Sequence, residues 1–356
     1  MNNSFVTQTL LTFVMRRKRM VALALDSSLS LKNTKHLPQQ PRVVKEEISG
    51  LIKVYKDGHV ERPQVVPCAT SNALAPELGI TSHDIVIDKF TGIWARFYVP
   101  KGNGDKLPLL VYFHGGGFCV GSSAWICYHD FLARLAAKAG CMIMSVNYRL
   151  APENPLPAAY DDGLKALMWL KLQATYSTSD LWSRKCDFTK MFLAGDSAGA
   201  NIAYNVAIRL NSSTSLKGLI LIQPFFGGEL RTHSEKHMVQ PPHSALTLNT
   251  SDIYWRLSLP SGSNRDHPWC NPTANGTINM KASKYLSVSI MVCVSEFDIL
   301  KDRSMEFCNA LAKSGTKVER LISRGVGHAF QVLSMSQISQ TRTNEMISHI
   351  KAFINK

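Results

Sequence analysis

Residues 190–210 read KMFLAGDSAGANIAYNVAIRL and contain a serine in a pattern typical of a nucleophile. Gly195, Ser197 and Gly199 fit G-x-S-x-G, with an apolar strand pattern before them and an amphipathic helix pattern after them. A turn this tight requires small residues on both sides of the serine, and it lifts the hydroxyl out of the sheet above a helix N-terminus. The pattern therefore predicts that Ser197 is a nucleophile.

A serine hydroxyl is a weak nucleophile at neutral pH, so it needs a general base that is itself oriented by an acid. Asp298 follows three residues after the apolar run 288–295, and His328 lies in the glycine-flanked loop RGVGHAF after the next strand pattern. The chain order serine, acid, histidine is the one that accompanies this strand–turn–helix serine. We predict that His328 is the base and Asp298 the acid, with Glu296 and Asp302 as alternatives for the acid.

A third motif, HGGGF at residues 114–118, follows a buried strand pattern. Consecutive glycines let backbone N–H groups approach a ligand closely, because no Cβ atom is in the way. Such a loop, together with the N–H of the residue after the nucleophile, can stabilise a tetrahedral oxyanion. A phosphate-binding turn is the alternative, but no G-x-G-x-x-G spacing or Walker lysine follows. The expected donors are the N–H groups of Gly115, Gly116 and Gly117, which lie between His114 and Phe118, and of Ala198, which follows Ser197.

Short strand patterns alternate with helix patterns along the rest of the chain, and these elements must position the three motifs. The expected strands lie at 83–87, 93–99, 107–113, 141–148, 190–195, 216–223, 288–295 and 317–323, and the expected helices near 124–139, 160–174, 198–211, 304–314 and 341–354. The later strands are continuous apolar runs, as in parallel sheets covered on both faces, and the first two or three alternate and suggest an antiparallel edge. The fold class is therefore α/β, with an open and mostly parallel sheet.

Residues 43–356 are expected to form a single α/β domain, and residues 1–42 a basic leader or targeting segment. The stretch 225–283 interrupts the strand–helix rhythm with many Pro, His, Asn and Trp residues. So long an irregular stretch inside a compact domain is usually an insertion or lid. We expect it to contribute to a cap over the carboxyl edge of the sheet. Aromatic residues that could line an apolar pocket there, or belong to the core, are Phe118, Trp125, Phe225, Phe226, Tyr254 and Trp255.

Composition excludes several classes of protein. The chain has 356 residues, of which 45% are hydrophobic and 19% charged, so it can bury a large core and is not disordered or fibrous. Its formal net charge of +14 suggests nucleic-acid binding, but residues 1–42 alone hold seven basic side chains and one acidic, Asp26. No basic block interleaved with aromatics, zinc-ligand spacing or helix-turn-helix pattern is present. We therefore expect no nucleic-acid partner.

The eight cysteines are scattered without a C-x-x-C pair, which predicts reduced thiols and not a disulfide framework. The N-terminal segment places its charged run RRKR after the apolar residues, unlike a secretory signal, and it is too short in apolar residues to span a membrane. Its Ser, Thr and basic residues also fit an organellar transit peptide. We expect a cytoplasmic protein without stable membrane insertion, with organellar targeting as the alternative.

Several motifs together resemble the hormone-sensitive-lipase-like branch of the α/β-hydrolases. They are HGGGF (114–118), NYRLAPENPLPAAYDD (147–162), GDSAGAN (195–201), the D-x-L of 298–300 and GHAF (327–330). Their order along the chain makes the resemblance more specific than any one of them. The stretches EEISGLIKVYKDGHVERP (46–63) and DHPWCNP (266–272) are similar to the plant carboxylesterases of that branch. The resemblance covers about residues 43–356.

The resemblance implies an α/β-hydrolase fold, with the N-terminal segment and the central insert forming the substrate pocket. It implies a triad of Ser197, Asp298 and His328, an oxyanion hole formed by Gly116 and Gly117 with the Ala198 amide, and no metal or organic cofactor. The gibberellin receptors share this fold and glycine loop but replace the catalytic histidine with an apolar residue. The presence of His328 argues against such a purely receptive role.

We therefore expect a serine carboxylesterase that hydrolyses small to medium apolar esters through an acyl-enzyme. Its partner is then a small-molecule ester. Two alternatives stay open: a hormone or metabolite receptor on the same scaffold, and a triad-bearing lyase or cyclase, because some plant relatives use the triad for cyclisation or elimination. The sequence specifies neither the natural substrate nor an oligomeric state.

Overall fold

The computed structural model describes residues 42–102, 106–176, 181–210, 216–240, 244–274 and 288–356. The chain divides into two compact units, with the boundary between Pro67 and Cys68. In the first unit, β1 (Val44–Ile48), β2 (Ile52–Tyr55) and β3 (Val60–Glu61) form an antiparallel three-stranded sheet. Gly50 and Gly58 lie in its turns, with φ angles of 73° and 85° that favour glycine. This sheet was not among the strands expected from the sequence.

The second unit is built on an eight-stranded sheet with the order β11-β10-β9-β8-β6-β7-β5-β4. Strands β6 to β11 run parallel to one another, and β5 is antiparallel to both β7 and β4. The bounds are β4 (Ile80–Asp88), β5 (Ile93–Pro100), β6 (Leu107–Phe113), β7 (Met142–Asn147), β8 (Cys186–Asp196), β9 (Leu216–Ile222), β10 (Ser289–Phe297) and β11 (Val318–Gly327). The sheet is thus mostly parallel with an antiparallel edge, as the sequence predicts.

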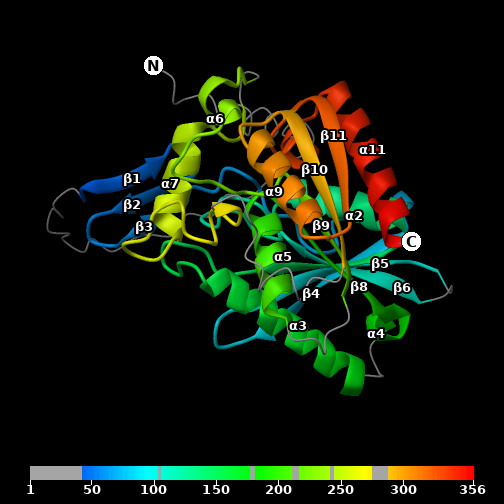
Figure 1. The fold of residues 1–356 in the computed structure, drawn as a ribbon. Helices are drawn as coiled ribbons and strands as arrows, with labels where there is room; N and C mark the ends of the chain where they lie inside the picture. Colours follow the sequence, from blue (N-terminus) through cyan, green and yellow to red (C-terminus); the bar gives the residue numbers. More distant parts are fainter. Residues whose placement is uncertain (1–41, 103–105, 177–180, 211–215, 241–243, 275–287) are drawn as a thin grey trace, which may run out of the picture. The chain divides into compact units, whose positions relative to one another are not determined.

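Helices cover both faces of this sheet. On one face lie α2 (Ile126–Ala139), which packs on β5 and β7, and α11 (Gln337–Ile354), which packs on β11 and α2. On the other lie α3 (Ala158–Tyr176), α5 (Ala198–Arg209) and α9 (Lys301–Lys313); α5 contacts β8 and β9, and α9 contacts β10. Figure 1 shows α9 and α11 on opposite sides of β10 and β11. Because both faces are covered, the central strands are apolar throughout, as in β9, whose last five residues are buried.

Four further helices are short or lie outside the strand–helix rhythm. They are α4 (Leu181–Lys185), α6 (His233–His237), α7 (Leu248–Ser258) and α10 (Phe330–Leu333), and a 3₁₀ turn spans Pro76–Leu78. The sequence patterns predict none of the four. Helix α7 nevertheless carries a helix-start signal, because the Thr247 hydroxyl accepts a hydrogen bond from the Thr250 N–H. Within the described residues no helix combines the length and the apolar character that crossing a membrane requires.

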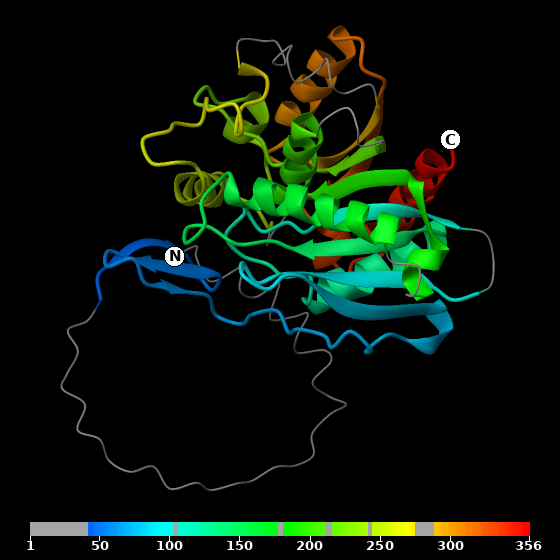
Figure 2. The ribbon, with the colours of Figure 1, turned by 90° about the horizontal axis from the view of Figure 1, so that it is seen from below.

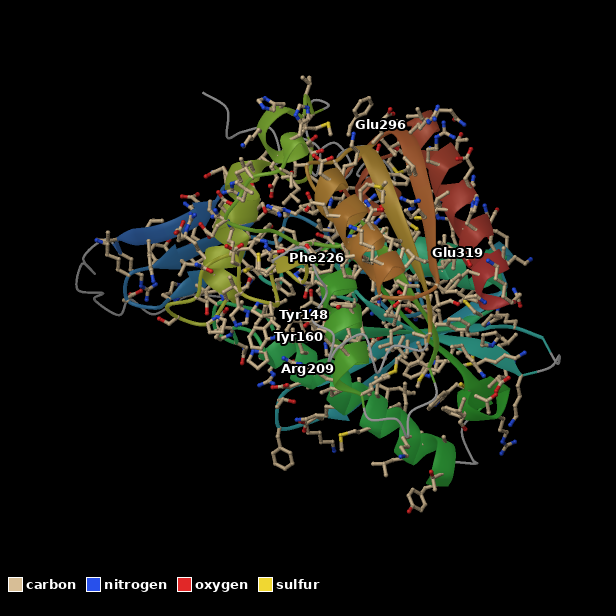
Figure 3. All side chains as sticks on the ribbon, viewed as in Figure 1. Tyr148, Tyr160, Arg209, Phe226, Glu296 and Glu319 are labelled. Carbon is tan, nitrogen blue, oxygen red and sulfur yellow. The ribbon has the colours of Figure 1, made fainter. Side chains whose placement is uncertain are left out.

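The insert at 225–283 is described at 225–240 and 244–274, and these residues contain α6, α7 and loops but no strand. Its loop around Trp269 is attached to α5. The Asn201 side-chain amide donates to the Trp269 carbonyl at 2.8 Å, and the Arg209 guanidinium lies 5.3 Å from the Trp269 ring. The same guanidinium lies 4.7 Å from the ring of Tyr160 on α3. Figure 2 shows α3 from below, and Figure 3 labels Tyr160 and Arg209. These contacts hold the insert against the helices that follow β7 and β8.

Candidate active site

The candidate site lies at one edge of the large sheet. Strands β6, β8, β9, β10 and β11 are parallel, so their carboxyl ends meet there. The HGGGF motif follows β6, Ser197 follows β8, and Asp298 and His328 follow β10 and β11 directly. The sheet topology therefore brings together segments that lie up to about 200 residues apart in the chain, and open α/β sheets commonly bind ligands at this edge.

Ser197 lies on a tight, strained turn between β8 and α5. Its φ and ψ angles are 53° and −120°, outside the regions that L-residues normally occupy. Glycine is required on both sides: a Cβ on Gly195 would lie 2.3 Å from the Gly199 carbonyl carbon, and a Cβ on Gly199 would lie 1.9 Å from the Phe113 oxygen. The close approach also shows that the turn packs directly on the start of the HGGGF loop.

The three predicted triad side chains form a continuous chain of hydrogen bonds. Ser197 Oγ lies 2.8 Å from His328 Nε2, and His328 Nδ1 donates to Asp298 Oδ2 at 2.7 Å. All three residues are buried, with exposed fractions of 6%, 7% and 1% for Ser197, His328 and Asp298. The second oxygen of Asp298, Oδ1, accepts from the Leu300 N–H at 3.0 Å, which fixes the carboxylate plane. With Nδ1 protonated toward Asp298, Nε2 is free to accept the serine proton.

The two alternative acids have other partners. Glu296 Oε2 accepts a hydrogen bond from the Gly325 N–H at 2.8 Å, and in Figure 3 Glu296 lies well apart from Tyr148, which contacts the HGGGF loop. Asp302 Oδ2 accepts from the Ser234 N–H at 2.6 Å and joins α9 to α6. Neither carboxylate is bonded to His328, so the geometry favours Asp298.

The HGGGF loop differs from the expectation at one glycine. The Gly115 N–H donates to the Tyr128 hydroxyl at 2.8 Å and to Asp196 Oδ1 at 3.1 Å, so it is not available to an oxyanion, and the expectation for Gly115 is wrong. By contrast, the N–H groups of Gly116, Gly117 and Ala198 have no hydrogen-bond partner among the described residues. These three are the donors that remain for a developing negative charge.

Gly116 and Gly117 require the absence of a side chain. Their φ angles are 111° and 58°, and Cβ atoms there would lie 2.1 Å from the Val120 oxygen and 2.2 Å from the Tyr254 ring. His114 is fully buried and stacks on Tyr148 at 4.3 Å between ring centroids, and its Nδ1 donates to the Gly115 carbonyl. Burial lowers the pKa of His114 to about 4, so it is neutral at pH 7 and serves as a support of the loop.

The aromatic residues of the expected pocket are mainly core. Phe118, Phe225, Phe226 and Trp255 are each at most 2% exposed, and the rings of Phe225 and Trp255 stack at 4.6 Å. The rings of Phe118, Phe225 and Trp255 pack on one another, while Phe226 packs on Tyr204 and Phe307. Trp125 is half-buried, and the Tyr254 ring lies against Gly117.

Two functional residues were missed by the sequence analysis. Asp196 is fully buried, and its carboxylate accepts from the hydroxyls of Tyr112 and Tyr128 at 2.8 and 3.0 Å as well as from Gly115. It therefore connects the turn of the nucleophile to the glycine loop. Burial raises its pKa to about 6, against the lowering effect of the tyrosine hydrogen bonds. The sequence marks Asp196 only by its position before the serine in G-D-S-A-G. Its role could not be read there, because its partners lie on β6 and α2.

The second missed residue is Gln223, which bonds to the segment after His328. Among the described non-glycine residues, Phe118, Ser197, Gln223 and Ala329 have positive φ angles, between 48° and 64°. All four lie in the HGGGF motif, in the nucleophile turn or beside the ends of β9 and β11. Such angles are strained for residues with a Cβ and gather at functional sites.

Within the described residues no group of three or more His, Cys, Asp or Glu side chains is arranged to hold a metal ion.

Comparisons with known proteins agree with this architecture. Residues 110–332 match the family described as the alpha/beta hydrolase fold. "Probable carboxylesterase 6" of Arabidopsis thaliana is 52% identical over 320 residues, which cover 88% of this chain and 92% of the relative. "Tuliposide A-converting enzyme b1, amyloplastic" of Tulipa gesneriana is 34% identical over 86% of this chain and 79% of its own.

The solved esterase structure of Pyrobaculum calidifontis superposes with a TM-score of 0.63 at 28% identity, covering 76% of this chain and 84% of that one. The sequence resemblance and the fold predicted from it are thereby confirmed. With the family match spanning more than half of the chain, and with a carboxylesterase more than half identical to it, this chain belongs to the α/β-hydrolase-fold family and, within it, to the group that contains the plant carboxylesterases.

Proposed function

We propose that this protein is a serine carboxylesterase in which Ser197, His328 and Asp298 hydrolyse small to medium apolar carboxylic esters. The observation that carries the proposal is the continuous hydrogen-bond chain from Ser197 Oγ through His328 to Asp298, buried at the carboxyl edge of the sheet. Membership of the carboxylesterase group supports the same reaction class.

In the first half-reaction, Ser197 Oγ attacks the ester carbonyl carbon while His328 Nε2 accepts its proton. Asp298 keeps the imidazole in the tautomer that accepts at Nε2 and stabilises the imidazolium that forms. The oxygen of the tetrahedral intermediate is stabilised by the unpaired N–H groups of Gly116, Gly117 and Ala198. His328 then protonates the leaving alkoxide, and the alcohol departs from an acyl-enzyme.

In the second half-reaction a water molecule takes the place of the alcohol. His328 accepts a proton from it, the resulting hydroxide attacks the acyl carbon, and collapse of the second intermediate returns the proton to Ser197 Oγ. The proposal needs no group beyond the side chains and amides described. The ester substrate class follows from the carboxylesterase group to which the chain belongs.

The test is hydrolysis of p-nitrophenyl esters from acetate to octanoate by the wild type and by Ser197→Ala. Removing the nucleophile is expected to lower kcat by about 10³ or more, because the triad acts as a unit. Ser145→Ala is the matched control, since Ser145 is a buried serine on β7 that is bonded to Ser123 and not to His328. Equal turnover by wild type and Ser197→Ala, or an inert wild type that binds a ligand tightly, would overturn the proposal.

We also propose a cytoplasmic location and a small-molecule ester as the partner, without nucleic acid. Relatives from tulip carry "amyloplastic" or "chloroplastic" in their names, so residues 1–42 are the segment on which an organellar location depends. Fluorescent fusions of the full chain and of a chain lacking residues 1–42 would distinguish the two. Plastid fluorescence that disappears with the deletion would contradict a cytoplasmic location.

A further inference from the structure

Gln223 lies where the supports of the nucleophile and of the base meet. It directly follows β9, between two backbone contacts to Ser197: the Ser197 N–H donates to the Ile222 carbonyl at 2.8 Å, and the Ser197 carbonyl accepts from the Phe225 N–H at 3.0 Å. The segment around Gln223 therefore holds both backbone polar groups of the nucleophile. Its own N–H donates to the Cys293 carbonyl on β10 at 2.8 Å, which fixes this segment to the next strand.

The side chain of Gln223 uses both ends of its amide. Oε1 accepts from the Ala329 N–H at 2.7 Å, directly after His328, and Nε2 donates to the Ser295 hydroxyl on β10 at 2.6 Å. Gln223 and Ser295 are each 1% exposed, so neither bond can be replaced by solvent without opening the core. Because Asp298 is three residues beyond Ser295 in the chain, the amide connects the segments that carry all three members of the triad.

The backbone at Gln223 lies in a conformation that is strained for a residue with a Cβ. Its φ angle is 48°, and that of its partner Ala329 is 57°, both in the left-handed region. A glutamine in this region is disfavoured relative to glycine. Strained backbone angles persist where other interactions of the residue hold them in place. At Gln223 these interactions are the two hydrogen bonds of the side-chain amide.

We propose that Gln223 is a positioning residue that sets the distance between Ser197 and His328 by holding Ala329 against the end of β9. This inference rests on the proposed function, since it concerns the same triad. Gln223 does not touch the reacting atoms, so it acts on the 2.8 Å contact between Ser197 Oγ and His328 Nε2 and not on substrate binding.

The first test removes the amide or changes its reach. Gln223→Met removes both hydrogen bonds, and Gln223→Asn keeps the amide but is one methylene too short to reach Ala329. Both are expected to lower kcat on p-nitrophenyl esters by about 10- to 100-fold with KM within about twofold, because misplacing a catalytic group by about 1 Å has an effect of this size. Gln223→Glu retains an acceptor for the Ala329 N–H, and is expected to recover about tenfold over Gln223→Met.

The second test separates positioning from a structural role. Gln223→Gly relieves the left-handed strain, so its Tm is expected to fall less than the loss of two buried hydrogen bonds alone would cause, while kcat falls as in Gln223→Met. Ser295→Ala leaves the bond from Ala329 to Gln223 but removes the hydroxyl that accepts from Gln223 Nε2. Its kcat is expected to lie between those of the wild type and Gln223→Met. The inference would be overturned if folded Gln223→Gly and Gln223→Met kept the kcat of the wild type. It would also be overturned if these variants changed KM alone.

The Ser197→Ala variant, measured beside these, keeps the two proposals distinguishable. If Ser197→Ala is inactive and the Gln223 variants match the wild type, the triad assignment stands and the role of Gln223 is wrong. If Ser197→Ala remains active, the proposed function itself fails.

Discussion

Asp196 and His114 show how burial shapes individual residues next to the nucleophile. Both are fully buried and both are hydrogen-bonded to Gly115, and their pKa values move in opposite directions. Desolvation disfavours the charged form of each, so the pKa of Asp196 rises to about 6 and that of His114 falls to about 4. Asp196 keeps a charge at neutral pH because two tyrosine hydroxyls and one N–H bond to it.

The raised pKa of Asp196 predicts a specific dependence of stability on pH. Between its ordinary value of 3.8 and about 6, the folded state binds more protons than the unfolded state, so this group's stabilisation is complete below 3.8 and is lost as pH rises through 6. The loss is about 3 kcal/mol. The free energy of unfolding of Asp196→Asn minus that of the wild type, from urea titrations, should therefore increase by about this amount between pH 4 and pH 7. A difference that stays constant with pH would contradict the prediction.

The orienting role of Asp298 gives a second prediction. Asp298→Asn preserves the shape of the side chain but favours the imidazole tautomer with the proton on Nε2, which cannot accept from Ser197. We expect kcat to fall by about 10⁴-fold. Glu296→Gln and Asp302→Asn are the controls, because their carboxylates bond to Gly325 and Ser234. Steady-state kinetics showing the larger loss in either control would reassign the acid.

Sequence reasoning could locate Ser197, Asp298 and His328 because each follows a strand of a parallel sheet, and the ends of parallel strands meet at one edge. It could not find Gln223 or the engagement of Gly115. Those depend on side-chain and backbone contacts between segments such as 113–128 and 196, whose pairing no local pattern encodes. Their roles become visible only in the folded structure.

At the scale of elements, the turn between β8 and α5 is the most tightly packed connection in the site. We expect Gly199→Ala to reduce the free energy of unfolding by about 3 kcal/mol or to prevent folding, because the added Cβ would meet the Phe113 carbonyl at 1.9 Å. Gly140→Ala, at the C-cap of α2, is the control: its φ angle is 70° but nothing lies within 4 Å of a Cβ there, so about 1 kcal/mol is expected. Equal unfolding midpoints for the two variants would show that crowding at Gly199 is relieved by movement.

The eight strands of the large sheet and the five long helices were predictable because their patterns are long and periodic. The misses are informative: β1 to β3 are short, α6 and α10 have five and four residues, and α7 lies in a segment whose composition suggested loop. The short elements hold too few residues for periodicity to reveal them, and caps such as the capping box between Thr232 and Glu235 stabilise them. Helix α7 has 11 residues, and the signal in its sequence is the cap at Thr247.

At the scale of the whole molecule, the eight cysteines act as a probe of the fold. All are free thiols, with Cys68 exposed and the other seven buried. Burial raises the thiol pKa of Cys127, Cys141, Cys186 and Cys293 to about 12, which suppresses the reactive thiolate. The scattered spacing predicts reduced thiols, and in the structure seven of the eight free cysteines lie in the core.

We predict that Ellman's reagent titrates one thiol quickly in the native protein and all eight in guanidinium chloride. A reducing agent should leave the Tm unchanged, because no cross-link contributes to stability. Cys68→Ser is the control and should remove the fast phase. Several fast thiols in the native state would show that the core opens far more readily than its packing suggests.

The four left-handed residues Phe118, Ser197, Gln223 and Ala329 have a consequence for how this protein can change over time. Each places a residue with a Cβ in a backbone conformation that glycine adopts more easily, and each lies where the reaction is proposed to occur. At Phe118 and Gln223 the side chain is buried and its contacts oppose a change to glycine, whereas the Ser197 hydroxyl serves the proposed reaction. A lineage that lost its substrate would thus be free to become more stable by replacing the serine of the turn with glycine.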